Sequence, residues 1–406
     1  MIFTYTDKGV CAAKGFRAAG IHCGVRKNKT KKDLCLIVSD VKCSAAALYT
    51  SNLVKGAPIT VTKQNLSDGK AQAIIVNSGN ANTCNSDGIE VARQMCALVE
   101  KYTGIPASDV VVASTGVIGQ KLSIEPIRNG MQTLVDGLGY NNSDDANEAI
   151  MTTDLKKKSV AVTFTLDGKE CHIGGIAKGS GMIHPNLATM LVFITTDAAI
   201  SSEMLEKALR EDVKDTFNMT SIDGDTSTND TLCVLANGLA GNREIIVEGE
   251  DFEIFKQALR AITEKMCRMI AADGEGATRM MEVRVSGAAD EDSARKIAKS
   301  IACSSLVKTA VFGADANWGR VLCALGYSGA QVDVGAVGVD FISEKGEIAV
   351  CRDGSGVEFS EEKAKEILLE DTIIINVTLK DGNASAKAFG CDLTYDYVKI
   401  NGDYRT

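Results

Sequence analysis

Helical and strand-like patterns of apolar residues alternate along the whole chain. Apolar positions recur every three or four residues in six segments, which predicts helices over 91–102, 127–138, 201–213, 251–270, 290–304 and 360–369. Short apolar or alternating runs predict strands over 34–38, 73–76, 110–113, 160–164, 190–195, 282–285, 331–339 and 373–379. The pattern indicates a mixed α and β protein built from layered sheets and helices.

Two polar segments are candidate boundaries in this pattern. Residues 144–158 carry acidic and amide side chains and end in Lys156, Lys157 and Lys158, which predicts a solvated helix or loop. Residues 241–251 form an acidic linker before the long helix, so a smaller C-terminal subdomain is expected from about residue 245.

Composition and charge narrow the class of protein. The net charge of −9 argues against general binding of nucleic acid or anionic membrane surfaces. No apolar run reaches the ~18–20 residues of a membrane helix, and the start lacks a signal-peptide pattern, so a cytoplasmic location is expected. Thirteen cysteines without a CxxC spacing are expected to be reduced and mostly buried. With three histidines, a multi-histidine metal site is not expected.

The segment 178–197 is the strongest candidate for chemistry. A glycine-rich entry and Pro185 lead to Thr189, at the start of a buried apolar strand that can hold a nucleophile rigidly. A threonine hydroxyl needs a nearby base, and chain cleavage before Thr189 would provide one in the new α-amine. By its pattern alone, a threonine at the start of a strand is far more often an ordinary β-branched strand residue.

Seven sequence blocks together resemble the ornithine acetyltransferase family, the bifunctional glutamate N-acetyltransferases that are also amino-acid acetyltransferases. The run 178–198 contains the Ala188-Thr189-Met190-Leu191 tetrapeptide of the family's self-cleavage signature. The other blocks lie in the family's order over essentially the whole chain, at 15–20, 76–82, 223–230, 273–278, 313–320 and 400–406. The resemblance implies cleavage between Ala188 and Thr189, giving an α chain of 1–188 and a β chain of 189–406. It also implies an α/β sandwich of helix, sheet, sheet and helix layers, similar to N-terminal-nucleophile hydrolases with different connectivity.

The same resemblance assigns roles to residues outside the cleavage segment. Thr115 and Gly116, in a turn after the strand 110–113, match the family's oxyanion-hole pair. Lys178 matches a substrate-binding lysine whose ammonium suits an amino-acid carboxylate, and Glu275 matches a substrate-binding glutamate that suits an amine.

Three further positions complete the implied binding set. Asn401 and the terminal Thr406 match the family's C-terminal binding residues, which requires the tail to fold back into the cleft. One of Thr152 and Thr153 matches a substrate-contacting threonine, but the lysine-rich segment after Asp154 departs from the family pattern, so the choice stays open.

The resulting hypothesis is an acetyltransferase of arginine biosynthesis with Thr189 as its nucleophile. It would move acetyl from N-acetylornithine to glutamate without a metal or bound cofactor, in a dimer of αβ units or a larger assembly. Acceptance of acetyl-CoA stays open. Two alternatives are an N-terminal-nucleophile aminopeptidase or amidase on the same fold, and a non-catalytic metabolite-binding protein.

Overall fold

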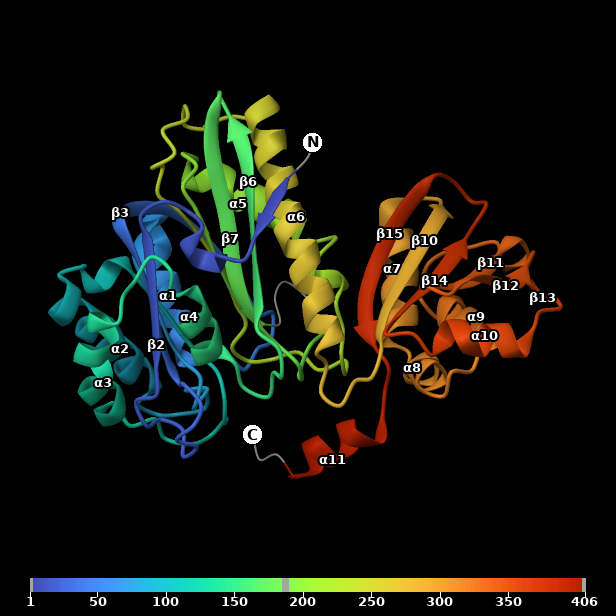
Figure 1. The fold of residues 1–406 in the computed structure, drawn as a ribbon, viewed down its shortest axis with the longest axis horizontal. Helices are drawn as coiled ribbons and strands as arrows, with labels where there is room; N and C mark the ends of the chain where they lie inside the picture. Colours follow the sequence, from blue (N-terminus) through green and yellow to red (C-terminus); the bar gives the residue numbers. More distant parts are fainter. Residues whose placement is uncertain (1–2, 185–189, 404–406) are drawn as a thin grey trace.

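The computed structural model describes residues 3–184 and 190–403, which form two β-sheets that each carry their own helices (Figure 1). The first sheet has the strand order β1-β6-β7-β8-β9-β3-β4-β5, with β2 paired to β3. Its strands are β1 (Thr4–Thr6), β2 (Phe16–Ile21), β3 (Leu34–Tyr49), β4 (Lys70–Asn77), β5 (Val110–Ser114), β6 (Lys158–Leu166), β7 (Lys169–Lys178), β8 (Leu191–Thr196) and β9 (Thr231–Ala236).

The first sheet folds back on itself across β3. The first part of this long strand, Leu34–Val38, pairs with β2 and β4, whereas its last part, Ser44–Tyr49, pairs with β9. Leu34, Leu36 and Val38 point to an outer apolar core, while the alternate residues of β3 point to an inner core between the two halves of the sheet. The period-2 alternation of a strand therefore separates the two cores.

Helices cover both outer faces of this folded sheet. They are α1 (Ala57–Asn65), α2 (Gly88–Thr103), α3 (Glu125–Asp136), α5 (Ser202–Asp212) and α6 (Glu250–Ala272), whereas α4 (Ser143–Ile150) packs into the inner core between the two halves. α2 and α3 pack on the half with β4 and β5, and α5 and α6 pack on the half with β6, β8 and β9. The order helix, sheet, sheet, helix confirms the layered α/β sandwich expected from the sequence.

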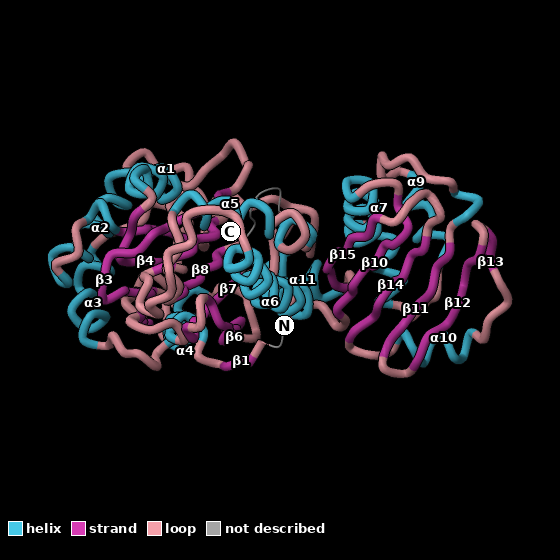
Figure 2. Tube along the Cα trace, turned by 90° about the horizontal axis from the view of Figure 1, so that it is seen from above, coloured by secondary structure: helices cyan, strands magenta, loops and turns pink. Residues whose placement is uncertain are grey.

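The second sheet lies beside the first and is reached through α6, which contacts β10 and β15 (Figures 1 and 2). Its strand order is β13-β12-β11-β14-β10-β15. Its elements are β10 (Met280–Ala288), α7 (Glu291–Cys303), α8 (Ser305–Phe312), α9 (Trp318–Gly326), β11 (Gly338–Ser343), β12 (Gly346–Arg352), β13 (Ser355–Gly356), α10 (Glu361–Leu368), β14 (Thr372–Thr378) and β15 (Ala384–Cys391). Its strands and helices enclose a separate apolar core.

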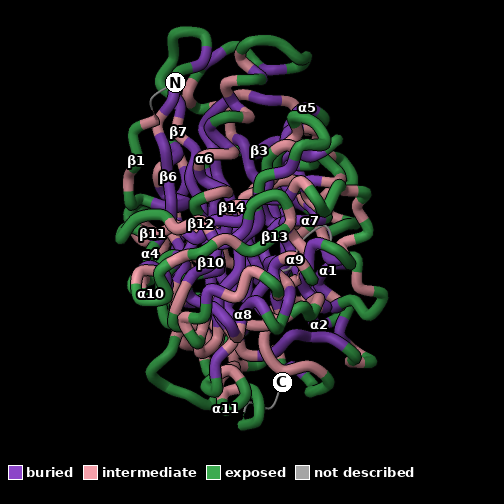
Figure 3. The backbone as a smooth tube through the Cα atoms, turned by 90° about the vertical axis from the view of Figure 1, so that its right-hand side faces the viewer, coloured by how far each residue is buried: buried purple, intermediate pink, exposed green. Residues whose placement is uncertain are grey.

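The chain then continues into α11 (Tyr395–Asp403), none of whose residues is buried (Figures 1 and 3). Short 3₁₀ turns complete the described chain, at Gly9–Cys11, Leu66–Asp68, Ala107–Asp109, Phe217–Met219 and Val334–Ala336. None of the helices in the described ranges is both long and apolar enough to cross a lipid bilayer.

All six expected helices are present, and seven of the eight expected strands are found at or within their expected positions. The exception is the strand expected over 331–339, where a 3₁₀ turn precedes β11. The carboxylate of Asp333 accepts the N–H of Gly335 at 3.0 Å, and this local hydrogen bond favours a turn over a strand ladder. All thirteen cysteines are free thiols and most are buried, as their spacing predicts.

Candidate active site

One cavity brings together the predicted site residues that the structure describes. Its lining includes Thr115, Gly116, Thr152, Thr153, Lys178, Glu275 and Asn401. Met190 and Leu191, at the start of β8, line the same cavity. The predicted Ala188, Thr189 and Thr406 lie outside the described residues.

Strand pairing explains why residues far apart in sequence meet here. β7 runs antiparallel to β8, and β8 runs parallel to β9, so Lys178, Leu191 and Thr231 stand side by side at one edge. β4 and β5 are parallel, so their last residues, Asn77 and Ser114, lie side by side. The turn after β5 thereby lies across the cavity from the end of β7.

The turn Thr115–Gly116 leaves two hydrogen-bond donors available at its side of the cavity. The backbone N–H of Thr115 donates to Asn77 O at 3.0 Å, so this N–H is already used. Among the described residues, no hydrogen bond uses the N–H of Gly116. Gly116 has φ +126, and a Cβ there would lie 2.7 Å from the carbonyl carbon of Gly79, so only glycine fits. The remaining donors are therefore the Thr115 hydroxyl and the Gly116 N–H.

Two asparagines hold this turn in place. Asn77 donates to Ser114 Oγ at 2.7 Å and accepts the N–H groups of Gly79 and Asn80. Asn229 donates to Ser114 O at 2.9 Å and to Ala81 O at 2.5 Å. Sequence reasoning had not identified Asn229 as a positioning residue, although it belongs to the block 223–230.

Lys178 is buried at the end of β7, with 9% of its surface exposed. Its Nζ donates to Thr115 Oγ1 at 3.3 Å, which leaves the Thr115 hydroxyl hydrogen free to donate into the cavity. Burial lowers the pKa of Lys178, while the charges of Asp154 and Asp230 oppose that decrease. The cavity thus contains a buried lysine with two buried acidic groups, Asp154 and Asp230, near its ammonium.

The lysine-rich segment before β6 is not solvated as its sequence suggests. Lys158 is fully buried and donates to Asp154 at 2.7 Å and to Asp273 at 2.6 Å. Burial raises the pKa of Asp154, but the charges of Lys158 and Lys178 outweigh it and lower this pKa to about 2. Asp273 comes from a distant part of the chain, and Asp154 lies in a buried loop. The polar residues of the segment 144–158 therefore give no local sign of this network. The expectation of a solvated stretch is wrong for Lys158 and for most of α4.

Asp154 and Asp273 carry this network to the cavity wall. Asp154 Oδ1 accepts the N–H of Gly179 at 2.7 Å, and its Oδ2 accepts the N–H of Thr152 at 3.0 Å. Asp273 Oδ2 accepts the N–H groups of Leu155 and Lys156, each at 3.1 Å. Asp273 is also two residues before Glu275 in the sequence. The two carboxylates that pair with Lys158 therefore hold the loop 152–156 and Gly179 at the cavity wall.

Glu275 enters the cavity from the turn after α6. Its N–H donates to Ser180 O at 2.8 Å, and a Cβ on Gly181 would lie 2.3 Å from its carboxylate, so glycine makes room for it. Asn401 of α11 donates to Glu275 Oε2 at 2.8 Å. The C-terminal helix thus reaches the cavity, as the sequence analysis required of the tail.

The two candidate threonines differ in their bonding. The hydroxyl of Thr153 pairs with Ser180 Oγ at 2.7 Å. Within the described chain, no hydrogen bond involves the hydroxyl of Thr152, which lines the same cavity. This difference favours Thr152 as the substrate contact.

The acidic block 223–230 serves the loop geometry. Asp223 accepts the N–H of Met182 at 2.6 Å and that of Ile183 at 2.9 Å, which holds the glycine-rich entry to β8. Among the residues that the structure describes, no group of three or more His, Cys, Asp and Glu side chains could hold a metal ion.

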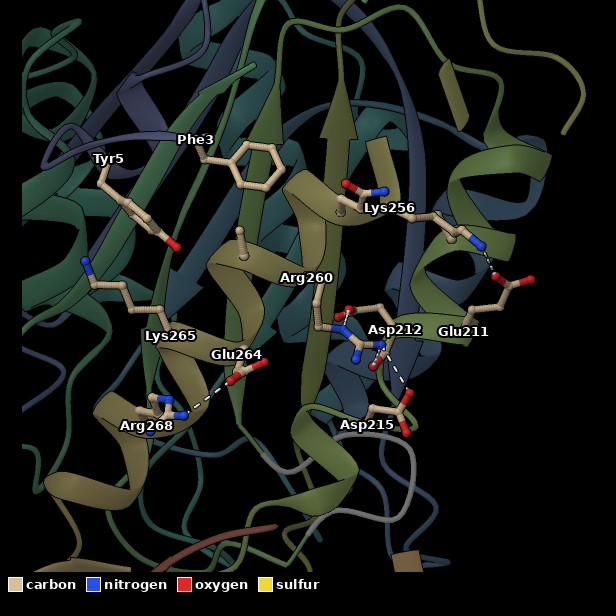
Figure 4. A pocket seen from close by; sticks show the side chains of 13 residues that line it. Phe3, Tyr5, Glu211, Asp212, Asp215, Lys256, Arg260, Glu264, Lys265 and Arg268 are labelled. Carbon is tan, nitrogen blue, oxygen red and sulfur yellow. Dashed lines mark hydrogen bonds and ion pairs between the residues drawn. The ribbon is translucent and has the colours of Figure 1, made fainter. Parts of the chain in front are cut away.

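A second hollow, along the outer side of α6, lacks comparable chemistry (Figure 4). Its charged side chains pair with one another, as in Arg260 with Asp212 and Asp215, Lys256 with Glu211, and Arg268 with Glu264. Lys265 Nζ stands 4.4 Å from the ring centre of Tyr5. Charges that already neutralise each other make this surface a less suitable substrate site than the cavity at Lys178.

Comparison with known proteins places this site in a family. The model of the ArgJ family matches residues 17–406. The chain is 49% identical over 394 residues to the arginine biosynthesis bifunctional protein ArgJ of Caldanaerobacter subterraneus subsp. tengcongensis, covering 97% of each chain. It is 48% identical over 401 residues to arginine biosynthesis bifunctional protein ArgJ 1 of Clostridium acetobutylicum, covering 98% of each.

A solved structure agrees with these relatives. The crystal structure of the arginine biosynthesis bifunctional protein ArgJ from Bacillus halodurans is 46% identical, with a TM-score of 0.50, and the match covers 53% of this chain and 98% of that one. The layered sandwich and its charged cavity are those of an enzyme for small polar molecules. The chain belongs to the ArgJ family.

Proposed function

We propose that this enzyme is a glutamate N-acetyltransferase of arginine biosynthesis, which transfers acetyl from N-acetylornithine to glutamate through an acetyl ester on Thr189. One observation carries the proposal: Thr115 and Gly116, the buried Lys178 and the carboxylate of Glu275 line one cavity at the start of the strand that follows Thr189. The names of the relatives support the same pathway.

The charges of the cavity suit the proposed substrates. Both N-acetylornithine and glutamate have an α-carboxylate, which the ammonium of Lys178 would bind. Glu275, with Asn401 bonded to it, would bind the cationic side chain of N-acetylornithine, and Thr406 would complete the binding set. Thr152, rather than Thr153, would contact the substrate. The hydroxyl of Thr115 and the N–H of Gly116 would donate to the tetrahedral oxyanion.

The nucleophile would work in two half-reactions. Thr189 Oγ1 attacks the acetyl carbonyl of N-acetylornithine, its own α-amine accepts the hydroxyl proton, and ornithine leaves. The amine of glutamate then attacks the acetyl ester and restores the Thr189 hydroxyl. This division into two steps implies ping-pong kinetics. Acetyl-CoA would be a second acetyl donor in a bifunctional member.

Self-cleavage between Ala188 and Thr189 would provide the α-amine. The Bacillus halodurans chain is covered almost completely yet matches only slightly more than half of this chain, which is the share that a fragment 189–406 would have. β8 and β9 lie between β7 and β3 in one sheet, so the two fragments would remain paired by strand hydrogen bonds. The proposed unit is this αβ pair, which would associate further into a dimer.

Purified protein is therefore expected to run as two fragments on a denaturing gel without added protease, and as one species in native size-exclusion chromatography. Intact mass should give 1–188 and 189–406, and N-terminal sequencing should begin with Thr189. A single uncut chain, or a new N-terminus elsewhere, would contradict the cleavage proposal.

Substitutions in the oxyanion turn and in the binding groups are expected to differ kinetically. Thr115→Ala removes a donor that acts on transition-state charge, so kcat should fall about 10²–10³-fold with little change in KM. Lys178→Met and Glu275→Gln remove charges that bind substrate in the ground state, so KM for N-acetylornithine should rise. Steady-state kinetics compares the three variants, and a normal kcat with a raised KM in Thr115→Ala would show that Thr115 binds substrate.

Product analysis separates transfer from hydrolysis. Incubation with N-acetylornithine should yield N-acetylglutamate only when glutamate is added. Release of free acetate at the same rate without glutamate would instead indicate an amidase. An uncut chain that never becomes acetylated would indicate a metabolite-binding protein.

A further inference from the structure

Asp230 is a buried acid in the cavity to which the family resemblance assigns no role. It directly precedes β9 and has 3% of its surface exposed. The backbone fixes its position from both sides, since Thr50 N–H donates to Asp230 O at 3.1 Å and Thr231 N–H donates to Met190 O at 3.0 Å. The backbone at Asp230 and Thr231 is thereby held next to Met190, the first described residue after Thr189.

One oxygen of this carboxyl group, Oδ2, is buried and has no hydrogen-bond partner among residues 3–184 and 190–403. Asp230 also lines the cavity with Thr115, Gly116 and Lys178. Buried polar atoms in folded proteins almost always have partners, because burial of an unpaired one is costly. A buried carboxyl oxygen at a ligand cavity therefore indicates a group that completes its bonding with substrate.

The electrostatic surroundings of Asp230 differ from those of Asp154. Burial raises the pKa of Asp230 well above its ordinary value, and the charge of Lys178 with hydrogen bonds from Ser227 and its own backbone only partly opposes the rise. Lys178 of β7 is the charged group that acts on it, Glu275 lines the same cavity, and Asp154 lies beyond Lys178. The pKa of Asp154, with Lys158 beside it, is lowered to about 2, whereas burial of Asp230 favours its protonated form.

We propose that Asp230 is a catalytic residue that binds the α-nitrogen of the amino-acid substrate through Oδ2 and carries one proton between the two half-reactions. This inference rests on the proposed acetyl transfer. The overall reaction converts N-acetylornithine and the ammonium of glutamate into N-acetylglutamate and the ammonium of ornithine, so it consumes no protons. Between the half-reactions neither amine is present. A titratable group in the cavity can then keep the proton that the amines exchange, in place of exchange with water.

The proton balance of the cycle is complete with Asp230 in this role. When the C–N bond of N-acetylornithine breaks, the leaving nitrogen receives the proton of the Thr189 hydroxyl, which the α-amine of Thr189 passes on. Protonated Asp230 donates a second proton to the same nitrogen. Ornithine therefore leaves as an ammonium. Glutamate arrives as an ammonium and gives one proton to ionised Asp230. Its nitrogen then attacks the ester, and a second nitrogen proton returns to Thr189 Oγ1 as the C–O bond breaks. Asp230 ends the cycle protonated, as it began.

This role predicts opposite pH dependences for the two half-reactions. Acetylation by N-acetylornithine needs protonated Asp230, so its rate falls as pH rises through the pKa of that group. Deacetylation by glutamate needs ionised Asp230, so its rate falls as pH decreases through the same pKa. Titration of the α-amine of Thr189 would affect both half-reactions in the same direction. The pH profiles therefore distinguish titration of this amine from titration of Asp230.

The test measures each half-reaction by the intact mass of the fragment 189–406. Wild-type enzyme is mixed with N-acetylornithine alone, and the acetylated enzyme is then mixed with glutamate, each over a range of pH. We expect one shared apparent pKa with opposite slopes. Asp230→Asn should slow both steps about 10²-fold and remove both slopes. The matched control is Asp225→Asn, which replaces an exposed carboxyl group of the same loop by an amide and should keep both slopes.

The outcomes separate this inference from the proposed function. Failure of wild-type enzyme to become acetylated would refute the transfer itself. Acetylation with slopes of the same sign, or with unrelated pKa values, would refute the proton-carrier role without any variant. Unaltered slopes in Asp230→Asn, whatever the rates, would show that Asp230 is only a structural or binding residue.

Discussion

Replacement of Thr189 with alanine is expected to abolish both cleavage of the chain and acetyl transfer. The same hydroxyl oxygen would attack the Ala188–Thr189 peptide bond and later the acetyl group, so no other atom replaces it. Loss of a covalent nucleophile typically costs roughly 10⁴–10⁶-fold in kcat. A denaturing gel should show one uncut chain, and intact mass should show no acetylation with N-acetylornithine.

Thr189→Ser is the matched variant for this prediction. It keeps the attacking oxygen and loses the methyl group that restricts the side-chain rotamer, so it should retain cleavage at a reduced rate. Substantial acetyl transfer by Thr189→Ala would mean that another residue is the nucleophile. Cleavage without transfer in that variant would separate the two activities that we assign to one hydroxyl.

Substitution of Lys158 by methionine is expected to destabilise the fold by about 3–5 kcal/mol, the usual cost of removing one partner from a buried ion pair. The variant leaves Asp154 and Asp273 buried without the cation that contacts both. Chemical denaturation followed by circular dichroism measures the free energy of unfolding. The variant should also bind substrate poorly, because Asp154 holds the N–H of Gly179 next to Lys178.

Lys157→Met is the matched control, since Lys157 pairs with Asp144 on the exposed surface. Exposed ion pairs contribute about 0–1 kcal/mol, so this variant should unfold almost as wild type does. Equal destabilisation by both substitutions would contradict the burial of the Lys158 network.

The pH dependence of stability provides a second measure of the Lys158 network. The folded-state pKa of Asp154, about 2, is below its ordinary value of 3.8, so its stabilising contribution is present above pH 4 and is lost as pH falls toward 2. In Lys158→Met this pKa should rise, and the stability difference from wild type should therefore decrease on acidification. A constant difference across this range would show that the Asp154–Lys158 pair is not the cause.

The sequence by itself determined the local elements and the motifs. Helical periodicity is a property of neighbouring residues, so α2, α3, α5, α6, α7 and α10 were predictable. The apolar run at 34–38 predicts a strand, and the apolar strand before Thr115 predicts a turn at its end. The block around Thr189 and the family resemblance indicated the residues that line the cavity.

Only the tertiary structure decided which charges are buried and what they contact. Lys157 and Lys158 are neighbours in a run of three lysines, yet one is on the surface and the other contacts Asp273, 115 residues away. Asp225 and Asp230 belong to one acidic block, yet only the second faces Lys178. The pairing of β7, β8 and β9 places these groups together. The charge and proton affinity of a side chain depend on such non-local neighbours, which no local pattern in the sequence specifies.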